Sequence, residues 1–221
     1  SGEDQDSSHD RISALRLGVS LNRCLTGCLG IDFQFSRGVD IASRSQGDVG
    51  KGTPLSRGSG KNNFSHFNLD TTYAVALDEK LELNINTGGQ LSLDDLLNSE
   101  QSSITGPDKL SGFTSGSISG DESWYFRGQL NYKKKLSNKL TLTPYVYGAT
   151  GVSYTLTPTA TENRATAARS IGLGLKMDGI DNYFFDKNIS AKVEYSKNWA
   201  SGVLEDVSDV RLNKQHLLVN L

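Results

Sequence analysis

Apolar and polar residues alternate along most of the chain. In LRLGVSLN, residues 15–22, leucine or valine occupies every second position, with polar residues or glycine between them. Because the side chains of a β-strand point alternately to its two faces, this period of two predicts strands with one apolar face. About nine segments show it. They are residues 15–22, 30–36, 67–77, 81–87, 124–132, 140–148, 170–177, 189–196 and 216–221.

The connections between these segments alternate in length. Short or medium connections are expected at 22–27, 78–80, 137–138 and 179–187, and long ones at 42–62, 94–121, 155–166 and 198–211. Outer-membrane barrels have short turns at the periplasmic rim and long loops at the outer rim. A soluble β-sandwich also alternates apolar and polar residues, but the loop lengths favour an all-β, transmembrane antiparallel β-barrel.

The polar face of the predicted strands carries several charges. A hydrated lumen accepts them better than a packed core, where an unpaired charge costs on the order of several kcal/mol. Pro144 lies inside a predicted strand and cannot donate to the ladder, which predicts a bulge or a special site there. The charged residues of this face are Asp32, Asp70, Glu82, Arg127, Lys192 and Glu194.

Composition and charge exclude several classes of function. The 221-residue chain has a formal net charge of −2, so there is no electrostatic reason to expect nucleic acid as a partner. The mean hydropathy of −0.41 argues against a membrane-spanning helix, but not against a barrel, in which only alternate residues face lipid. His9, His66 and His216 lack metal-site spacing, and the paired carboxylates fall in predicted turns. We therefore expect no catalytic site, metal or cofactor.

The start of the chain and its two cysteines leave alternatives open. SGEDQDSSHD lacks the regions of a signal peptide, so we expect either a protein that is not exported or a piece of a longer one. Cys24 and Cys28 make a poor zinc site without histidine or further cysteine. If they bracket a hairpin turn, a disulfide is possible in an oxidising compartment; two free thiols are the alternative.

The segment from 97 to 132, LNSEQSSITGPDKLSGFTSGSISGDESWYFRGQLNY, resembles a known signature. It is similar to the loop region of the two-partner secretion transporters, the haemolysin secretion/activation family of TpsB type. PYVYGATGVSY and SIGLGLKM resemble two later strands of that family, and the resemblance covers nearly the whole chain. The matching loop residues are Ser99, Glu100, Gln101, Gly106, Pro107, Gly112, Phe113, Gly116, Ser119, Gly120, Asp121 and Trp124.

The resemblance implies a sixteen-stranded barrel preceded by two POTRA domains. Residues 1–221 would supply its last nine strands, with the POTRA domains and early strands absent from this chain. The loop at about 94–121 would fold back into the lumen. Its expected tip is Leu110, Ser111, Gly112 and Phe113, and the expected wall partners are Tyr147, Ala149 and Gly151. The expected recognition strand for outer-membrane assembly contains Leu217, Val219 and Leu221.

Two departures from the family pattern fall at positions that are expected to contact each other. The tip arginine of the family is Ser111 here, and the wall aspartate is Ala149. In the family these two positions are proposed to form an ion pair. Losing both avoids a buried unpaired charge, so we expect the tip to dock by packing and hydroxyl bonds. A divergent or decayed member is the alternative. The phenylalanine after Ser-Glu-Gln is also replaced, by Ser102.

The resemblance also implies a function. It predicts a pore in the outer membrane of a Gram-negative bacterium that secretes an unfolded exoprotein of haemolysin or adhesin type. Membrane lipid and the barrel-assembly machinery would be further partners. One alternative is the related surface-antigen or barrel-assembly branch, for which an arginine in the loop is expected. Another is a soluble β-sandwich adhesin or binding module with a dry interior. An isolated nine-stranded sheet would be expected to aggregate.

Overall fold

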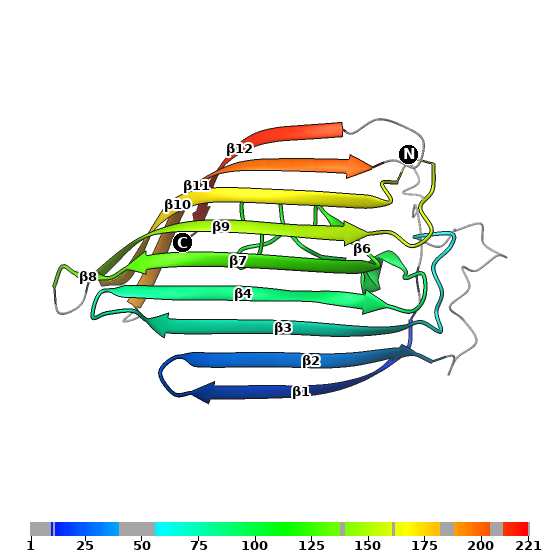
Figure 1. Ribbon diagram of the computed structural model, residues 1–221, viewed down its shortest axis with the longest axis horizontal. Helices are drawn as coiled ribbons and strands as arrows, with labels where there is room; N and C mark the ends of the chain where they lie inside the picture. The colour runs from blue at the N-terminus through cyan, green and yellow to red at the C-terminus, as the bar shows by residue number, and fades with distance from the viewer. Residues whose placement is uncertain are drawn as a thin grey trace, which may run out of the picture.

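The computed structural model describes residues 10, 12–39, 56–137, 140–160, 162–181, 188–203 and 210–220. Nearly all of its regular structure is antiparallel sheet, as predicted (Figure 1). Beside the strands, one short 3-10 helix, η1 (Asn98–Glu100), lies between β4 and β5. The strands are β1 (Ala14–Cys24), β2 (Cys28–Gly38), β3 (Ser65–Ala76), β4 (Leu81–Ser92), β5 (Ser102–Ser103), β6 (Ser119–Gly120), β7 (Glu122–Tyr132), β8 (Lys134–Lys135), β9 (Thr141–Tyr154), β10 (Ala165–Asp181), β11 (Asn188–Val203) and β12 (Val210–Asn220).

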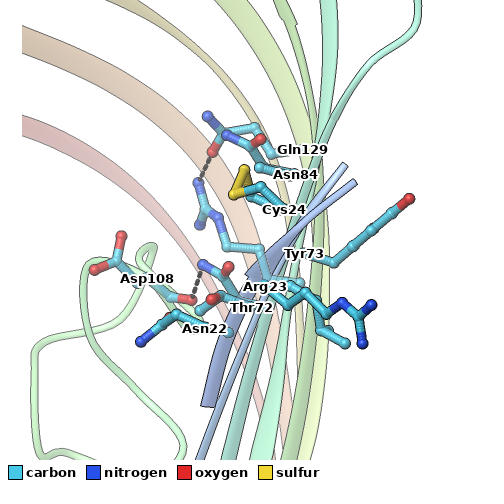
Figure 2. A pocket seen from close by; sticks show the side chains of 14 residues that line it. Asn22, Arg23, Cys24, Thr72, Tyr73, Asn84, Asp108 and Gln129 are labelled. Carbon is cyan, nitrogen blue, oxygen red and sulfur yellow. Dashed lines mark hydrogen bonds between the residues drawn. A yellow bond between two sulfur atoms is a disulfide. The ribbon is translucent and has the colours of Figure 1, made fainter. Parts of the chain in front are cut away.

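One large sheet contains every strand except β5 and β6. Its order is β1-β2-β3-β4-β7-β9-β10-β11-β12, and the short β8 pairs with β9. Each strand lies beside its neighbour in the chain, as in an up-and-down barrel. The sheet is curved, and the segment between β4 and β7 lies on its concave side (Figure 2). Within the described residues the long strands form one continuous curved sheet rather than two packed sheets, which is not the arrangement of a β-sandwich.

The two faces of the sheet differ as the alternation predicts. On β1, Leu15 and Leu17 are 66% and 69% exposed on the convex face, and apolar residues dominate this face on the later strands as well. On the concave face, Arg127 and Glu194 are nearly fully buried. An apolar convex face and a polar concave face are the arrangement of a membrane barrel, whose outside meets lipid.

Two local predictions were wrong. Residues 198–211 were expected to be a loop, but β11 continues to Val203 and β12 begins at Val210. Polar residues such as Asn198 persist in the strand because they point to the polar concave face. Pro144 causes no bulge. On one side of β9 it is the register partner of Leu175 on β10. On the other side it has no register partner, but the pairing of β9 with β7 and with β8 keeps the same register before and after it. The register shift of β10 lies instead between Asp178 and Ile180.

Two structural features are absent from the described residues. No helix among them is long and apolar enough to cross a membrane. No group of three or more histidine, cysteine or acidic side chains within the same residues is arranged to hold a metal ion.

Candidate functional site: the long loop and the inner wall

The connection between β4 and β7, residues 93–121, is the main element on the concave side of the sheet. Its two arms pair briefly, since β5 and β6 form a two-stranded hairpin. Gly106 and Gly116 have φ of 150° and 78°, a region that glycine tolerates best, and so allow the turns between the arms. The segment is therefore a folded hairpin-like loop, which we call the long loop.

Apolar side chains hold the long loop against the wall. Ile104 and Leu110 are fully buried in one cluster with the wall residues Tyr145, Tyr147 and Ala149. The cluster also contains Tyr125 and Ala168, and Phe113, Ile118 and Ala200 pack against it. The loop thus contributes two completely buried aliphatic side chains, each worth about 1.5–3 kcal/mol when removed from water. Leu110 and Phe113 were predicted at the loop tip from the sequence, whereas the role of Ile104 was not predicted.

At the tip, the hydroxyl of Ser111 lies between two wall charges. Arg127 Nη1 on β7 donates to Ser111 Oγ at 2.5 Å, and Ser111 Oγ donates to Glu194 Oε1 on β11. Arg127 Nη2 also lies 3.3 Å from Glu194 Oε2. Tyr145 donates from its hydroxyl to the same carboxylate oxygen at 2.7 Å. We call Ser111, Arg127, Tyr145 and Glu194 the tip site.

Glycine is required beside the tip site. The carbonyl oxygen of Gly112 accepts a hydrogen bond from Asn198 Nδ2 at 2.5 Å. A Cβ at this position would overlap the side chains of Asn198 and Ser196. Asn198 is in turn held by Ser170, whose hydroxyl donates to Asn198 Oδ1 at 2.8 Å. Because Gly112 has no side chain, the loop backbone lies close against the side chains of β11, and a larger residue would displace Asn198 and Ser196.

Two glycines on β10 let side chains reach across that strand. Gly174 pairs with both Tyr145 on β9 and Glu194 on β11, so the three residues form one row across the sheet. A Cβ on Gly174 would overlap the Tyr145 ring, and one on Gly172 would overlap the Tyr147 ring. Because both positions lack a side chain, each tyrosine ring lies over β10. This explains the glycine spacing of SIGLGLKM in physical terms.

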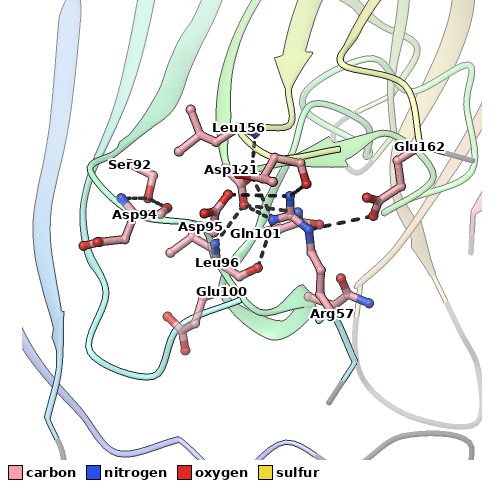
Figure 3. A network of polar contacts seen from close by, with 12 residues as sticks. Arg57, Ser92, Asp94, Asp95, Leu96, Glu100, Gln101, Asp121, Leu156 and Glu162 are labelled. Carbon is pink, nitrogen blue, oxygen red and sulfur yellow. Dashed lines mark hydrogen bonds and ion pairs between the residues drawn. The ribbon is translucent and has the colours of Figure 1, made fainter. Parts of the chain in front are cut away.

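The base of the long loop is fixed by a second buried ion pair, Arg57 with Asp121 (Figure 3). Arg57 Nη1 lies 2.6 Å from Asp121 Oδ1, and Asp121 is completely buried. The carboxylate also accepts hydrogen bonds from the backbone N–H groups of Leu96, at 3.0 Å, and Leu156, at 2.8 Å. Arg57 further donates to the carbonyl oxygen of Thr157. This base cluster joins three connections of one rim: 56–64, 93–101 and 155–164.

The N-terminal part of the long loop makes a third charged contact, through Glu100. Glu100 accepts two hydrogen bonds from Arg16 on β1, at 2.6 and 2.7 Å, and contacts His66 on β3. Burial by itself would raise the pKa of Glu100, but the contacts with His66 and Arg16 outweigh it, and the pKa is lowered. The carboxylate is therefore ionised in the folded protein at neutral pH.

A family model describes this chain over most of its length. The model for the haemolysin secretion/activation protein ShlB/FhaC/HecB matches residues 2–177. The chain belongs to this family. The resemblance based on the loop signature is thereby confirmed, and so are the barrel architecture and the location in the outer membrane of a Gram-negative bacterium.

One solved structure supports the fold of this ShlB/FhaC/HecB family member. CdiB from Escherichia coli superposes with a TM-score of 0.69 and 18% sequence identity, over 97% of this chain and 37% of that one. The chain thus spans little more than a third of the length of that structure. A comparison with curated proteins finds no match.

Ser111 and Ala149, the two positions at which the resemblance implies a lost ion pair, both lie in the tip region. Ala149 is 7% exposed and is the register partner of Arg127 across β7 and β9. The Arg127 guanidinium carbon lies 3.7 Å from the centre of the Tyr147 ring. A wall cation and a wall anion, with the hydroxyl of Ser111 between them, therefore lie where the resemblance implied docking without an ion pair. The sequence pattern predicts that Arg127 and Glu194 lie on the inward face, but it does not indicate that they pair.

The remaining predicted residues have separate places. A Cβ on Gly151 would press on Ile104 of the long loop and on the backbone of Trp124. Gly116 is exposed at the far turn of the loop, and Pro107 is exposed beside Gly106. Ser119 and Gly120 form β6. Leu217 and Val219 pair with Tyr195 and Val193 of β11, and Leu221 lies outside the described residues.

The cysteines lie at the opposite end of the sheet from the base cluster. Cys24 and Cys28 are joined by a disulfide across the β1–β2 turn, which resolves the alternative of free thiols. They line a cavity of about 290 Å³ together with Arg127 and Asp108 (Figure 2). Asn86 Nδ2 donates to the backbone carbonyl of Asp108 at 3.2 Å, which ties the loop to β4 on this side.

Proposed function

We propose that the full-length protein is a two-partner secretion transporter that passes an exported partner protein across the outer membrane. Residues 1–221 supply nine barrel strands, and POTRA domains and further strands complete the molecule. The partner is an unfolded exoprotein of haemolysin or adhesin type. No chemical step is required of the chain, whose family is a secretion family rather than an enzyme family.

One observation carries the proposal: the long loop is docked on the concave wall by both apolar and charged contacts. The tip lies on the wall through Leu110, Ser111 and Gly112, and the base is tied to the rim through Asp121. A segment held in this way obstructs the space inside the sheet. The polar groups of the long loop and of the wall can form hydrogen bonds with water when the loop detaches. This suits a plug that is displaced when a polypeptide passes through the pore.

The partners other than the exoprotein follow from the same architecture. The convex face requires outer-membrane lipid, because its leucines and valines are exposed. We assign the last strand, with Leu217, Val219 and Leu221, to recognition by the barrel-assembly machinery during insertion.

The test is a secretion assay with the full-length protein. It is expressed in Escherichia coli together with haemolysin-type and adhesin-type exoproteins from the same genome, and the culture medium is assayed for each exoprotein. We expect one of them to appear in the medium only when the transporter is present. A transporter that is folded in the outer membrane, as shown by heat-modifiable migration, and that releases none of them would refute the proposal.

A shorter variant tests the role of the long loop. Replacing residues 103–119 by a short Gly-Ser linker removes the docked part and leaves the base cluster in place. We expect larger single-channel conductance in planar bilayers than for the intact protein. Equal conductance would show that the long loop does not obstruct the pore.

A further inference from the structure

The convex face carries two charged residues where apolar ones are expected. Arg169 on β10 lies four residues from the end of its strand, and Lys197 on β11 lies six residues from the end of its strand. The other charged residues at outward positions with described side chains are Arg23, Arg37, Glu122 and Lys134, all within one residue of a strand end. A charge on the lipid face costs about 2–4 kcal/mol at mid-membrane and about 0–1 near the interface.

The two cations are close to each other and mark the end of the apolar band. Arg169 pairs with Trp199, and Ile171 pairs with Lys197, so Arg169 and Lys197 are diagonal neighbours across β10 and β11. Such neighbours have Cα atoms about 7–8 Å apart, within reach of one shared anion. Toward the short-turn end of β10, the outward residues are Ile171, Leu173 and Leu175, all exposed.

Lys197 is directed toward the rim that carries the long loops. Its Nζ lies 5.4 Å from the centre of the Trp199 ring, and Trp199 is two residues nearer to that rim. Lysines near the edge of a membrane extend in this direction so that the ammonium reaches the headgroup level. Among the described residues, no carboxylate forms an ion pair with Arg169 or Lys197. Both charges are therefore available to a phosphate at that level.

Directly beside the cations is an apolar groove of about 570 Å³ on the same convex face. Its floor is the pair Gly128 and Gly148, which are register partners on β7 and β9. A Cβ on Gly148 would meet nothing within 4 Å, so the surface is hollow there. The walls are Leu83, Leu130, Val146, Ile171, Leu173 and Tyr195, and Lys197 closes one end.

We propose that this surface is a binding site for one anionic lipid that carries phosphate. The phosphate lies between Arg169 and Lys197, and an acyl chain fills the groove over Gly128 and Gly148. Charge complementarity selects the headgroup, because two neighbouring cations without carboxylate partners face the lipid. The groove selects an apolar chain, because its walls are aliphatic and aromatic. A headgroup and a chain joined in one molecule satisfy both parts of the site at once.

The test is native mass spectrometry of the full-length protein released from neutral detergent. Phosphatidylglycerol and phosphatidylcholine with identical acyl chains are added in equal amounts, and the bound copies of each are counted. Each basic residue near a membrane surface contributes about 1 kcal/mol toward an anionic lipid, so the two together should give a preference for phosphatidylglycerol of roughly thirtyfold. The preference should vanish in R169Q/K197Q and persist in R169K/K197R and in the control R23Q.

The groove is tested separately. G148L places a side chain in open space and fills the groove, so it should lower the bound copies of both lipids several-fold. T71L adds similar bulk on the outward face of β3 and should not. Equal preference in the wild type and R169Q/K197Q, or unchanged occupancy in G148L, would overturn the proposal. Heat-modifiable migration of each variant shows that it has folded.

Discussion

Arg127 on β7 and Glu194 on β11 are separated by two strands of the sheet, yet their side chains meet at 3.3 Å with the Ser111 hydroxyl bound to both. Both residues are almost completely buried. The pair is made possible by Gly174, which leaves room over β10, and it lies under the tip of the long loop. The tip of the long loop therefore docks directly on a buried ion pair of the wall.

The first prediction concerns Glu194. E194Q leaves the buried Arg127 without its anion, and breaking such a pair costs about 3–5 kcal/mol. We expect the tip of the long loop to detach and single-channel conductance to rise. E82Q is the matched control, because Glu82 pairs with exposed Lys133. If E194Q conducts like E82Q, the ion pair does not hold the loop.

The second prediction concerns the two family positions. S111R places a second cation against Arg127 and should raise conductance, because like charges are buried together. A149D, on the register partner of Arg127, supplies an anion at the wall. We expect S111R/A149D to conduct less than S111R alone. A double-mutant cycle measures this coupling, and no coupling would show that Ala149 is not the wall partner of the tip.

The third prediction concerns Gly174. G174V puts a branched side chain where the Tyr145 ring lies and should remove its hydrogen bond to Glu194. We expect a loss of about 1–3 kcal/mol for the buried group left unsatisfied, seen as a lower melting temperature. G148V on the convex face is the control, since its Cβ meets nothing. Equal destabilisation by G174V and G148V would mean that the change in strand propensity, rather than the displaced Tyr145 ring, causes the loss of stability.

The fourth prediction concerns the base cluster. D121N removes the negative charge that pairs with Arg57. It also replaces one of the two carboxylate oxygens that accept hydrogen bonds from the backbone N–H groups of Leu96 and Leu156. Because three connections of the rim meet there, we expect faster trypsin cleavage at Lys61 and Arg164 in the folded protein. D94N, which breaks an exposed pair with Lys61, is the control for cleavage at Arg164. Unchanged cleavage in D121N would show that the connections are held elsewhere.

The fifth prediction is a pH dependence. The lowered pKa of Glu100 means that its contacts stabilise the fold above the unfolded-state value of 4.5, and that this contribution is lost as pH falls through the folded-state value. The difference in melting temperature between wild type and E100Q should therefore be present at pH 7 and shrink below about pH 4. A difference that stays constant down to pH 3 would exclude a role for the Glu100 charge.

The strands and their faces were predictable because each depends on neighbours in sequence. Leu15, Leu17 and Val19 alternate with polar residues, and a strand of that composition can expose only one apolar face. The polar run around Asn198 shows the limit of this reasoning. Polar residues at consecutive positions look like a loop until it is known that one face of the strand is itself polar.

The sequence alone thus determined the antiparallel strands, the long loop with Leu110 and Phe113, and the family to which the loop signature belongs. Only the tertiary structure decided which charges meet. Arg127 and Glu194 are 67 residues apart, and Arg57 and Asp121 are 64 apart. No local pattern encodes such a pair, because it depends on the register of every strand between them and on the absence of a side chain at Gly174.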